Sequence, residues 1–395
     1  MARLRDRLAL APRFPVIIVG GTNGKGSTCA MLEACLLRAG YRVGCYTSPH
    51  LLRYNERVRI NGAEASDSLL VAAFERVERA RGDVSVTYFE FGTLAAVLLF
   101  LEAQVDVAIL EVGLGGRLDA VNAFEPDCAV VASIGLDHMD YLGPTREHIG
   151  FEKAGIFRAD KPAVVAEINP PASLVKHARD IGADLYLVDR DFGYVAGDVQ
   201  WQFWDWRGKR DGLPLPALRG MCQLSNASAA LAALDSLRER LPVDMGAIRR
   251  ALVEVELPGR FQVMPGRPLV ILDVAHNPDA ALRLAENLRR LERSGRRLAV
   301  FSMLKDKDIE GVITVMSDQI DEWFIAPLPG PRGADLERLR RAFAAAGSTA
   351  PVHSLASVDD ALHRVREGAG PDDKILVFGS FYTVADALRA LDPHN

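Results

Sequence analysis

A glycine-rich segment near the N-terminus has the residue types needed to bind phosphate groups. Residues 20–28 read GGTNGKGST, between the apolar run PVIIV and a stretch with helical spacing of apolar residues. Glycines let backbone N–H groups turn toward an anion, a helix N-terminus carries about half a positive charge, and Lys25 adds a full one. Ser27 and Thr28 each offer a hydroxyl to Mg²⁺, and the pattern leaves both open. The strict motif GxxxxGK[ST] is not met, because Gly26 follows Lys25.

Polar side chains follow two further apolar runs that we predict to be strands. Glu111 closes the run VAILE, and Asp137 with His138 follows CAVVASIGL. The carboxyl ends of parallel strands meet at one edge of a sheet, where ligands bind. Because Mg²⁺ prefers oxygen ligands, we expect Glu111 to hold Mg²⁺ beside the glycine-rich segment. His138 is either a metal ligand or a hydrogen-bonded structural histidine, and taken alone the second is favoured.

Lys153 lies in the apolar stretch FEKAGIF, within a helix predicted from about residue 147 to residue 157. A buried ammonium group is costly, and its pKa shifts readily. This lysine therefore either extends its head to water, pairs with an acid such as Glu152, or is chemically modified.

The C-terminal half has its own polar cluster after a predicted strand. The segment ILDVAHNPDA places Asp273, His276 and Asn277 together, although a capping role would be enough to explain Asn277. Arg260, in LPGRFQ, has the chemistry to contact phosphates. Asn226, in CQLSNASAAL, opens a helix and is either a ligand contact or an N-cap.

The order of the predicted elements indicates an α/β protein with parallel sheets and two domains. Short apolar runs alternate with helical stretches, and a second such cycle begins near Pro268 with strands at PLVILDVAH, RRLAVFSML, DEWFIAPLP and KILVFGS. The segment LPGRFQVMPGRP is predicted to be the hinge, which gives domains at residues 1–264 and 265–395. Residues 193–220 break the rhythm and predict a hairpin. Its three tryptophans either stack on a ring-shaped substrate or pack on a sheet, and the second is favoured.

Composition excludes several classes of protein. The chain has 395 residues, of which 49% are hydrophobic and 25% charged, so a disordered or collagen-like chain is excluded. A net charge of -5 gives no general electrostatic reason to bind nucleic acid or a membrane. Its longest apolar stretches are about half the roughly 20 residues that span a bilayer. Five scattered cysteines indicate neither a zinc site nor disulfides, and we expect a cytoplasmic protein.

A series of motifs, in order along the chain, resembles the folylpolyglutamate synthases, specifically the bifunctional dihydrofolate synthase type of bacteria. The motifs are GTNGKGST, TSPHLLRYNERVRING, FEFGTLAA, LEVGLGGRLDAVN, SIGLDHMDYLG, FEKAGIFR, LPGRFQ, DVAHNP, LKDKD and FGSFYTVAD. This family belongs to the Mur ligase superfamily. The resemblance implies a P-loop NTPase-type parallel-sheet domain followed by a Rossmann-like α/β domain.

The resemblance also implies an activity, an ATP-dependent ligation. ATP would phosphorylate a carboxylate of the pterin substrate, and the amine of L-glutamate would attack the acyl phosphate. The implied substrates are dihydropteroate, reduced folates and L-glutamate, and the implied state is a monomer.

Motif by motif, the resemblance implies roles for individual residues. Those implied to bind ATP are Thr22, Asn23, Gly24, Lys25, Gly26, Ser27, Thr28, Asn226, Arg260 and Asp273. The implied Mg²⁺ ligands are Ser48, Glu111 and His138, with a second Mg²⁺ held partly by Lys153 in carbamylated form. Catalysis is implied for Lys25, Lys153, Asp273 and His276, and pterin binding for Phe89 and Asp119.

Two alternatives compete with this interpretation. A ligase that adds amino acids to UDP-muramoyl peptides would share the phosphate loop and the Glu, His, Lys and Arg positions, but not TSPHLLRYNERVRING. Such a ligase normally carries a further N-terminal nucleotide-sugar domain. A P-loop kinase would explain the loop but not a second α/β domain with DVAHNP.

Overall fold

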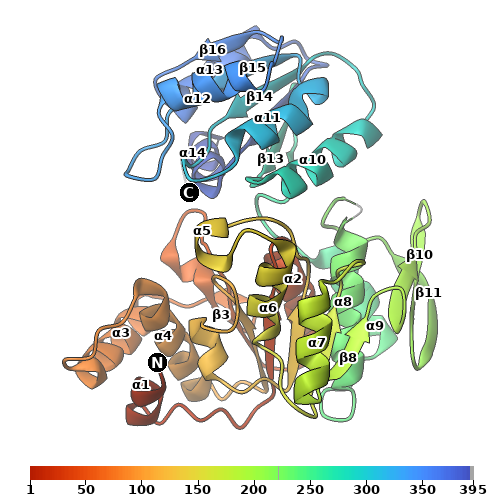
Figure 1. Cartoon of the computed structure of the whole chain (residues 1–395). Helices are drawn as coiled ribbons and strands as arrows, with labels where there is room; N and C mark the ends of the chain where they lie inside the picture. The colour runs from red at the N-terminus through yellow and green to blue at the C-terminus, as the bar shows by residue number, and fades with distance from the viewer. Residues whose placement is uncertain (221, 392–395) are drawn as a thin grey trace. The chain divides into compact units, whose positions relative to one another are not determined.

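The computed structural model describes residues 1–220 and 222–391, which form two compact units (Figure 1). The first unit holds residues 1–217 and 222–256, and the second holds residues 218–220 and 257–391 of the described chain. The predicted boundary, at 265, lies eight residues beyond this division at 257. Within the predicted hinge, β12 (Gln262–Met264) pairs antiparallel with β13 (Leu269–Asp273), so part of the hinge is a strand of the second unit.

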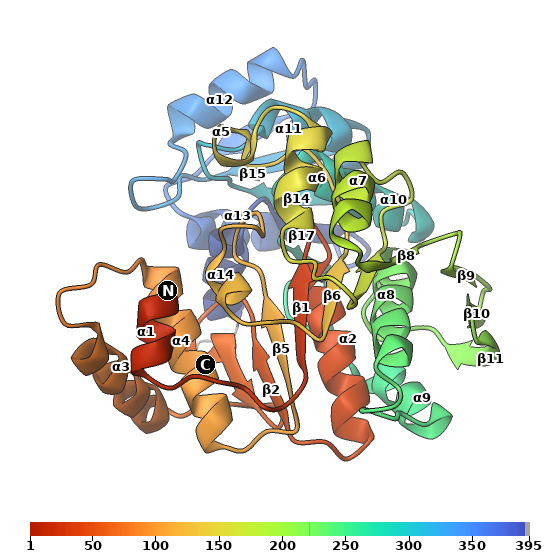
Figure 2. The same cartoon turned by 60° about the horizontal axis from the view of Figure 1, so that its bottom comes forward.

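An eight-stranded sheet forms the centre of the first unit, in the order β4-β3-β2-β5-β1-β6-β7-β8 (Figure 2). Its strands are β1 (Val16–Gly20), β2 (Val43–Tyr46), β3 (Val58–Ile60), β4 (Ala63–Glu64), β5 (Val107–Glu111), β6 (Cys128–Val131), β7 (Pro162–Val165) and β8 (Asp184–Leu187). The strands from β2 to β8 in this order are parallel, whereas β3 and β4 extend one edge antiparallel. Every residue of β1 and β5 is buried, as expected of central parallel strands covered on both faces.

Helices cover both faces of this sheet. They are α1 (Ala2–Arg7), α2 (Lys25–Arg38), α3 (Asp67–Arg81), α4 (Tyr88–Glu102), α5 (Met139–Leu142), α6 (Arg146–Ala154), α7 (Ala172–Ile181), α8 (Cys222–Ser236) and α9 (Met245–Glu254), with short 3₁₀ turns η1 (Tyr54–Arg57) and η2 (Ala120–Ala123). Helices α4, α6 and α7 share one core with Ile18 and Leu110 of the central strands. Helix α2 packs instead against α8 and α9.

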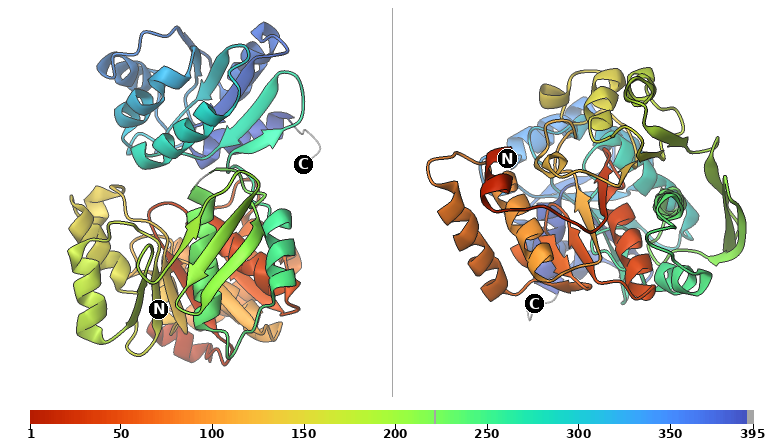
Figure 3. Two further views of the ribbon diagram at one scale, coloured as in Figure 1. Left: turned by 90° about the vertical axis from the view of Figure 1, so that its right-hand side faces the viewer. Right: turned by 90° about the horizontal axis from the view of Figure 1, so that it is seen from below.

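The aromatic segment is a three-stranded antiparallel sheet, which confirms the predicted excursion (Figure 3). It consists of β9 (Phe192–Val195), β10 (Gln200–Asp205) and β11 (Gly208–Pro214). Trp201 is buried, Trp204 packs over Gly193, and Trp206 stacks on Tyr186 with ring centroids 4.0 Å apart. Trp201 and Trp204 are therefore packing residues, as expected, whereas Trp206 remains 39% exposed.

The second unit is built on a six-stranded sheet in the order β12-β13-β17-β14-β15-β16. Its further elements are β14 (Arg297–Phe301), β15 (Glu322–Ile325), β16 (Val352–Ser354), β17 (Lys374–Phe378), α10 (Pro278–Arg290), α11 (Ile309–Met316), η3 (Ser317–Gln319), α12 (Leu336–Ala345), α13 (Val358–Gly368) and α14 (Phe381–Leu391). The four predicted strands are present, and the three-residue β16 was not predicted. No helix in the described ranges combines the length and apolar character needed to cross a membrane. All five cysteines are free, and four are buried.

Candidate active site

The glycine-rich segment forms the turn between β1 and α2, where a phosphate loop is expected. Gly24 precedes α2 with a φ of 85°, a conformation that favours glycine. A Cβ at this position would lie 2.5 Å from Oδ1 of Asn226, so the loop and α8 approach too closely for a side chain. Among the described residues, no side chain caps the start of α2. Its first N–H groups are therefore free of a side-chain acceptor, as an anion site requires.

Ser133, just after β6, fixes the shape of this loop. Its carbonyl accepts from the Thr22 amide (2.8 Å), and its Oγ accepts from the Asn23 amide (2.9 Å). The Thr22 hydroxyl in turn donates to the Gly135 carbonyl (3.1 Å). Sequence reasoning did not single out Ser133, although its place directly after a predicted strand was the available signal.

The side-chain hydrogen bonds of the loop indicate which hydroxyl, that of Ser27 or that of Thr28, is available to a ligand. Lys25 Nζ donates to the carbonyls of Gly21 (3.0 Å) and Thr22 (3.2 Å), so the ammonium lies over the loop. The Thr28 hydroxyl donates back to the Gly24 carbonyl (3.0 Å). Ser27 makes no side-chain hydrogen bond to residues 1–220 or 222–391. Ser27 is therefore the better placed of the two for Mg²⁺ or phosphate.

Two of the predicted Mg²⁺ ligands are joined directly. Glu111 ends β5, is buried, and its Oε2 accepts from the Ser48 amide at 2.9 Å. His138 follows β6, beyond β1 in the sheet order, with a left-handed φ of 52°, and its amide donates to Asp137 Oδ1 (2.8 Å). Across the described ranges no group of three or more His, Cys, Asp or Glu side chains is arranged to hold a metal. The predicted set contains only two such side chains, so it stays a prediction.

Lys153 is buried in α6, as its apolar sequence setting implied. Its pKa is lowered to about 7, first by burial and then by the positive charge of Lys25, while Asp137 and Asp119 oppose the shift. An amine with this pKa is largely neutral near physiological pH, so it can act as a nucleophile.

Phe89 and Asp119 meet at the loop that follows β5. The Phe89 ring lies where a side chain at Gly113 would be, 2.8 Å from the Cβ position, and stands 5.6 Å from the Tyr46 ring. Asp119 Oδ2 accepts from the Leu114 amide (2.9 Å), one residue along the same loop. Burial raises the pKa of Asp119 to about 6 against the effect of these amide donors. The structure thus brings both predicted pterin residues to one aromatic wall with a nearby carboxyl.

The second unit gathers its predicted residues at the carboxyl end of β13. Asp273 accepts from the amides of Phe261 and Ala275, each at 2.8 Å, and burial raises its pKa while Arg260 opposes the rise. The Arg260 guanidinium lies 5.0 Å from the centroid of the Phe381 ring, and the His276 ring lies 6.3 Å from it. Phe381 begins α14 and was missed from the sequence, because nothing in FGSFYTVAD distinguishes it from a core residue.

His276 has a defined tautomer in this arrangement. Its Nδ1 lies 2.9 Å from the Val274 carbonyl, which can only accept, so Nδ1 carries the hydrogen. The other ring nitrogen, Nε2, is then the basic one when the ring is neutral.

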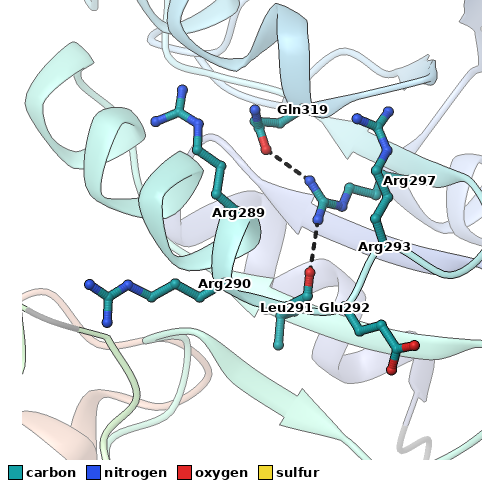
Figure 4. Close-up of a pocket in the computed structure, with 7 residues that line it drawn as sticks. All are labelled: Arg289, Arg290, Leu291, Glu292, Arg293, Arg297 and Gln319. Carbon is teal, nitrogen blue, oxygen red and sulfur yellow. Dashed lines mark hydrogen bonds between the residues drawn. The ribbon is translucent and has the colours of Figure 1, made fainter. Parts of the chain in front are cut away.

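A cavity of about 440 Å³ in the second unit contains none of the predicted site residues (Figure 4). It is lined by Arg289, Arg290, Leu291, Glu292, Arg293, Arg297 and Gln319. Arg297 begins β14, so the cavity lies at the opposite end of the parallel strands from Asp273. Its guanidinium donates to Gln319 Oε1 (2.8 Å) and to the Leu288 carbonyl (2.6 Å). Arg297 therefore satisfies the carboxyl end of α10, which is a structural role.

Comparison with known proteins places these features in one family. The Mur ligase middle domain matches residues 19–234, and the Mur ligase glutamate ligase domain matches residues 259–381. The dihydrofolate synthase/folylpolyglutamate synthase of Escherichia coli K12 is 48% identical over 97% of this chain and 88% of that protein. A P-loop kinase does not account for the second matched domain.

Solved structures agree. Escherichia coli FolC in complex with DHPP and ADP has a TM-score of 0.94 at 47% identity, covering 99% of this chain and 92% of that one. A bifunctional folylpolyglutamate synthase/dihydrofolate synthase with Mn, AMPPNP and L-glutamate bound has a TM-score of 0.92 at 46% identity, covering 99% and 93%. The chain therefore belongs to the dihydrofolate synthase/folylpolyglutamate synthase family of the Mur ligases.

Proposed function

We propose that the protein is an ATP-dependent ligase that joins L-glutamate to dihydropteroate, forming dihydrofolate, and to the γ-carboxylate of reduced folates. The observation that carries this proposal is that two parts of the candidate site follow adjacent strands of the sheet. The phosphate loop follows β1, and Phe89 of α4 packs against Gly113 in the loop after β5, the strand that pairs with β1. An acid bound between Phe89 and Asp119 would lie beside the phosphates of ATP.

The chemistry follows from the weakness of a carboxylate as an acyl donor. Transfer of the γ-phosphoryl group of ATP to a carboxylate oxygen releases ADP and leaves an acyl phosphate. The amine of L-glutamate then attacks the acyl carbon, a tetrahedral intermediate forms, and phosphate leaves as the amide forms and the amine loses its proton. The protein's main tasks are to position three reactants and to bind the developing charge.

The loop residues are proposed to hold ATP in this scheme. Backbone amides from Gly24 to Thr28, with Lys25, would bind the phosphates, supported by Thr22, Asn23 and Asn226. Ser48, Glu111 and His138 would hold Mg²⁺, and a buried carboxylate next to a serine fits a hard cation. The metal, when bound, supplies positive charge to the transferring phosphoryl group.

The remaining roles follow the predicted assignments. A carbamate on Lys153 would turn a costly buried ammonium into an anion able to help hold a second Mg²⁺. Arg260 and Asp273 would contact ATP, and Asp273 and His276 would contribute to catalysis. We propose a cytoplasmic, monomeric enzyme.

The deciding experiment measures ADP release with Mg²⁺ and ATP, with each component omitted in turn. L-Glutamate is supplied with dihydropteroate or with a reduced folate monoglutamate. Turnover that needs glutamate with both acids is expected, and Lys25→Met should abolish it while Lys176→Met, at an exposed lysine of α7, should not. Turnover with the folate alone would remove the dihydrofolate synthase activity. Turnover only with UDP-muramoyl peptide precursors would replace the proposal with the cell-wall alternative.

A further inference from the structure

Arg57 is a buried cation whose charge no carboxylate balances. It ends η1, and only 9% of its surface is exposed. Its Nε donates to Nδ1 of His50 at 2.8 Å. In the described part of the chain, neither Nη atom donates to a protein group and no carboxylate lies within ion-pair distance. A buried charge without a partner is expensive, so the site is shaped for an anion that comes from outside the chain.

The neighbours of Arg57 do not supply that anion. His50 accepts the Arg57 Nε hydrogen at its ring Nδ1 and therefore contributes no negative charge. Glu56 is adjacent in sequence, but its carboxylate accepts from the amides of Leu51 (2.7 Å), Leu52 (2.6 Å) and Arg53 (2.7 Å). The local carboxylate therefore shapes the turn and leaves Arg57 unbalanced.

Two tyrosine rings hold the guanidinium in place. Its central carbon lies 5.5 Å from the centroid of the Tyr54 ring and 5.4 Å from that of Tyr88. Contacts with ring faces orient a guanidinium without neutralising its charge. The planar fork is thus pre-organised, with both Nη atoms left for a ligand.

This arginine belongs to the same aromatic wall as Phe89. The hydroxyls of Tyr54 and Tyr46 meet at Gly92, and the Tyr46 ring packs 5.6 Å from that of Phe89. Burial raises the pKa of Tyr46, and the charge of Arg57 opposes this rise, so the two groups lie within electrostatic reach of each other.

We propose that Arg57 binds a carboxylate of the acid substrate through its two Nη atoms. The inference rests on the proposed function, because dihydropteroate and reduced folates both carry carboxylates. A carboxylate and a guanidinium form paired, charge-assisted hydrogen bonds, the geometry that Arg57 leaves open. Arg57 would thereby fix the carboxylate end of a substrate whose ring lies against Phe89.

The test compares Arg57→Gln and Arg57→Lys with a matched control. Hydrogen bonds to charged groups contribute about 1.5–3 kcal/mol, so Arg57→Gln should raise KM for the acid about 10- to 100-fold. KM for ATP should stay within about twofold, because the phosphate loop is untouched. Arg57→Lys keeps the positive charge but lacks the paired Nη donors, so its KM for the acid should lie between those of wild type and Arg57→Gln. The control is Arg53→Gln, in the same segment, whose side chain is 63% exposed and paired with Asp67.

The outcomes separate this proposal from the proposed function. Turnover by the wild-type protein tests the proposed function, whereas the ratio of variant to wild-type affinity for the acid tests the role of Arg57. Equilibrium dialysis of dihydropteroate with ADP present measures this ratio without turnover. An effect on both acids assigns the reacting carboxylate, and an effect on folates alone assigns their α-carboxylate. Unchanged affinity for both acids would overturn the proposal, as would equal losses for ATP and acid with a lowered Tm. If Arg57→Gln does not fold, Arg57→Lys decides by the same criterion.

Discussion

Lys153 should react with carbon dioxide, and its surroundings set how readily. Its pKa falls from 10.5 to about 7 in the folded protein. At pH 7.5 about three quarters of the amines are then neutral, against about 0.1% for an unperturbed lysine. This lowering of the pKa corresponds to roughly 5 kcal/mol against the ammonium form. The folded protein therefore holds this proton less tightly than the unfolded chain, so the penalty is full below about pH 7 and fades toward pH 10.5.

Substitution should separate a carbamate from an ammonium. Lys153→Arg keeps a cation but cannot be carbamylated, and Lys153→Ala removes the group. If the carbamate is the working form, both should lose about 10²- to 10³-fold in kcat, the usual loss for a group that binds developing charge. Added bicarbonate should restore neither variant. Carbon-13 NMR of protein equilibrated with labelled bicarbonate should show a carbamate signal in wild type that is absent from Lys153→Ala.

Lys176→Ala serves as the control, because this lysine is exposed in α7 and paired with Asp180. It should retain both the activity and the carbamate signal. Wild-type activity in Lys153→Ala would remove the residue from the mechanism. Full activity in Lys153→Arg together with no carbamate signal would show that a cation at this position is sufficient, and the chemical argument would be refuted.

Three further outcomes test other parts of the structure. Asp235 is buried and paired with Arg210, and burial raises the pKa of its carboxyl to about 6 while Arg210 opposes the rise. A carboxyl whose pKa is raised in the folded protein adds stability below about pH 4, and this contribution is lost as the pH rises through about 6. The free energy of unfolding of wild type should therefore fall by about 1.4 kcal/mol between pH 5 and pH 8 because of this group. Asp235→Asn should remove that loss in urea unfolding, and an unchanged pH dependence would contradict it. Gly24→Ala places a Cβ against Asn226 at a residue with a left-handed φ. The affinity for ADP, measured by calorimetry, should therefore weaken at least about tenfold, and an unchanged affinity would show that the loop adapts. Phe381→Ala removes the ring that contacts Arg260 and His276. Either KM for ATP should rise or kcat should fall, by about tenfold, while Tm shifts by only a few degrees. Unchanged kinetics would show that the ring has only a structural role.

The sequence was informative where chemistry and secondary structure coincide. GGTNGKGST follows an apolar run and opens a helix, so its position between β1 and α2 could be predicted from local pattern alone. Glu111 and Asp273 were located by the same logic, because each closes a buried strand. Burial of Lys153 followed from its apolar helical neighbours, and the structure confirms it.

Other parts depend on contacts between segments distant in the chain. Ser133 shapes the phosphate loop only because β6 pairs with β1, more than 100 residues apart. Phe381 supports Arg260 only because β17 lies beside β13. The predicted hinge contains β12, since antiparallel pairing with β13 satisfies backbone groups that a single-sequence pattern leaves undetermined. Short strands such as β16 carry too few residues for a clear period.

The charges at the carboxyl edge of the first sheet form a consistent pattern. Lys153 is buried with a lowered pKa, Asp119 has a raised one, and Arg57 has no carboxylate within ion-pair distance in the described part of the chain. The first two arrangements disfavour the charged form of their group, and the third leaves a buried cation without a carboxylate partner, so selection for stability alone would be expected to remove all three. They become favourable once groups of opposite charge, or a proton donor for the carboxylate, bind at this edge. A ligase that binds a nucleotide, a metal and a pterin acid has ligands of this kind. The unfavourable electrostatics of the protein by itself and the proposed function therefore indicate the same edge of the sheet.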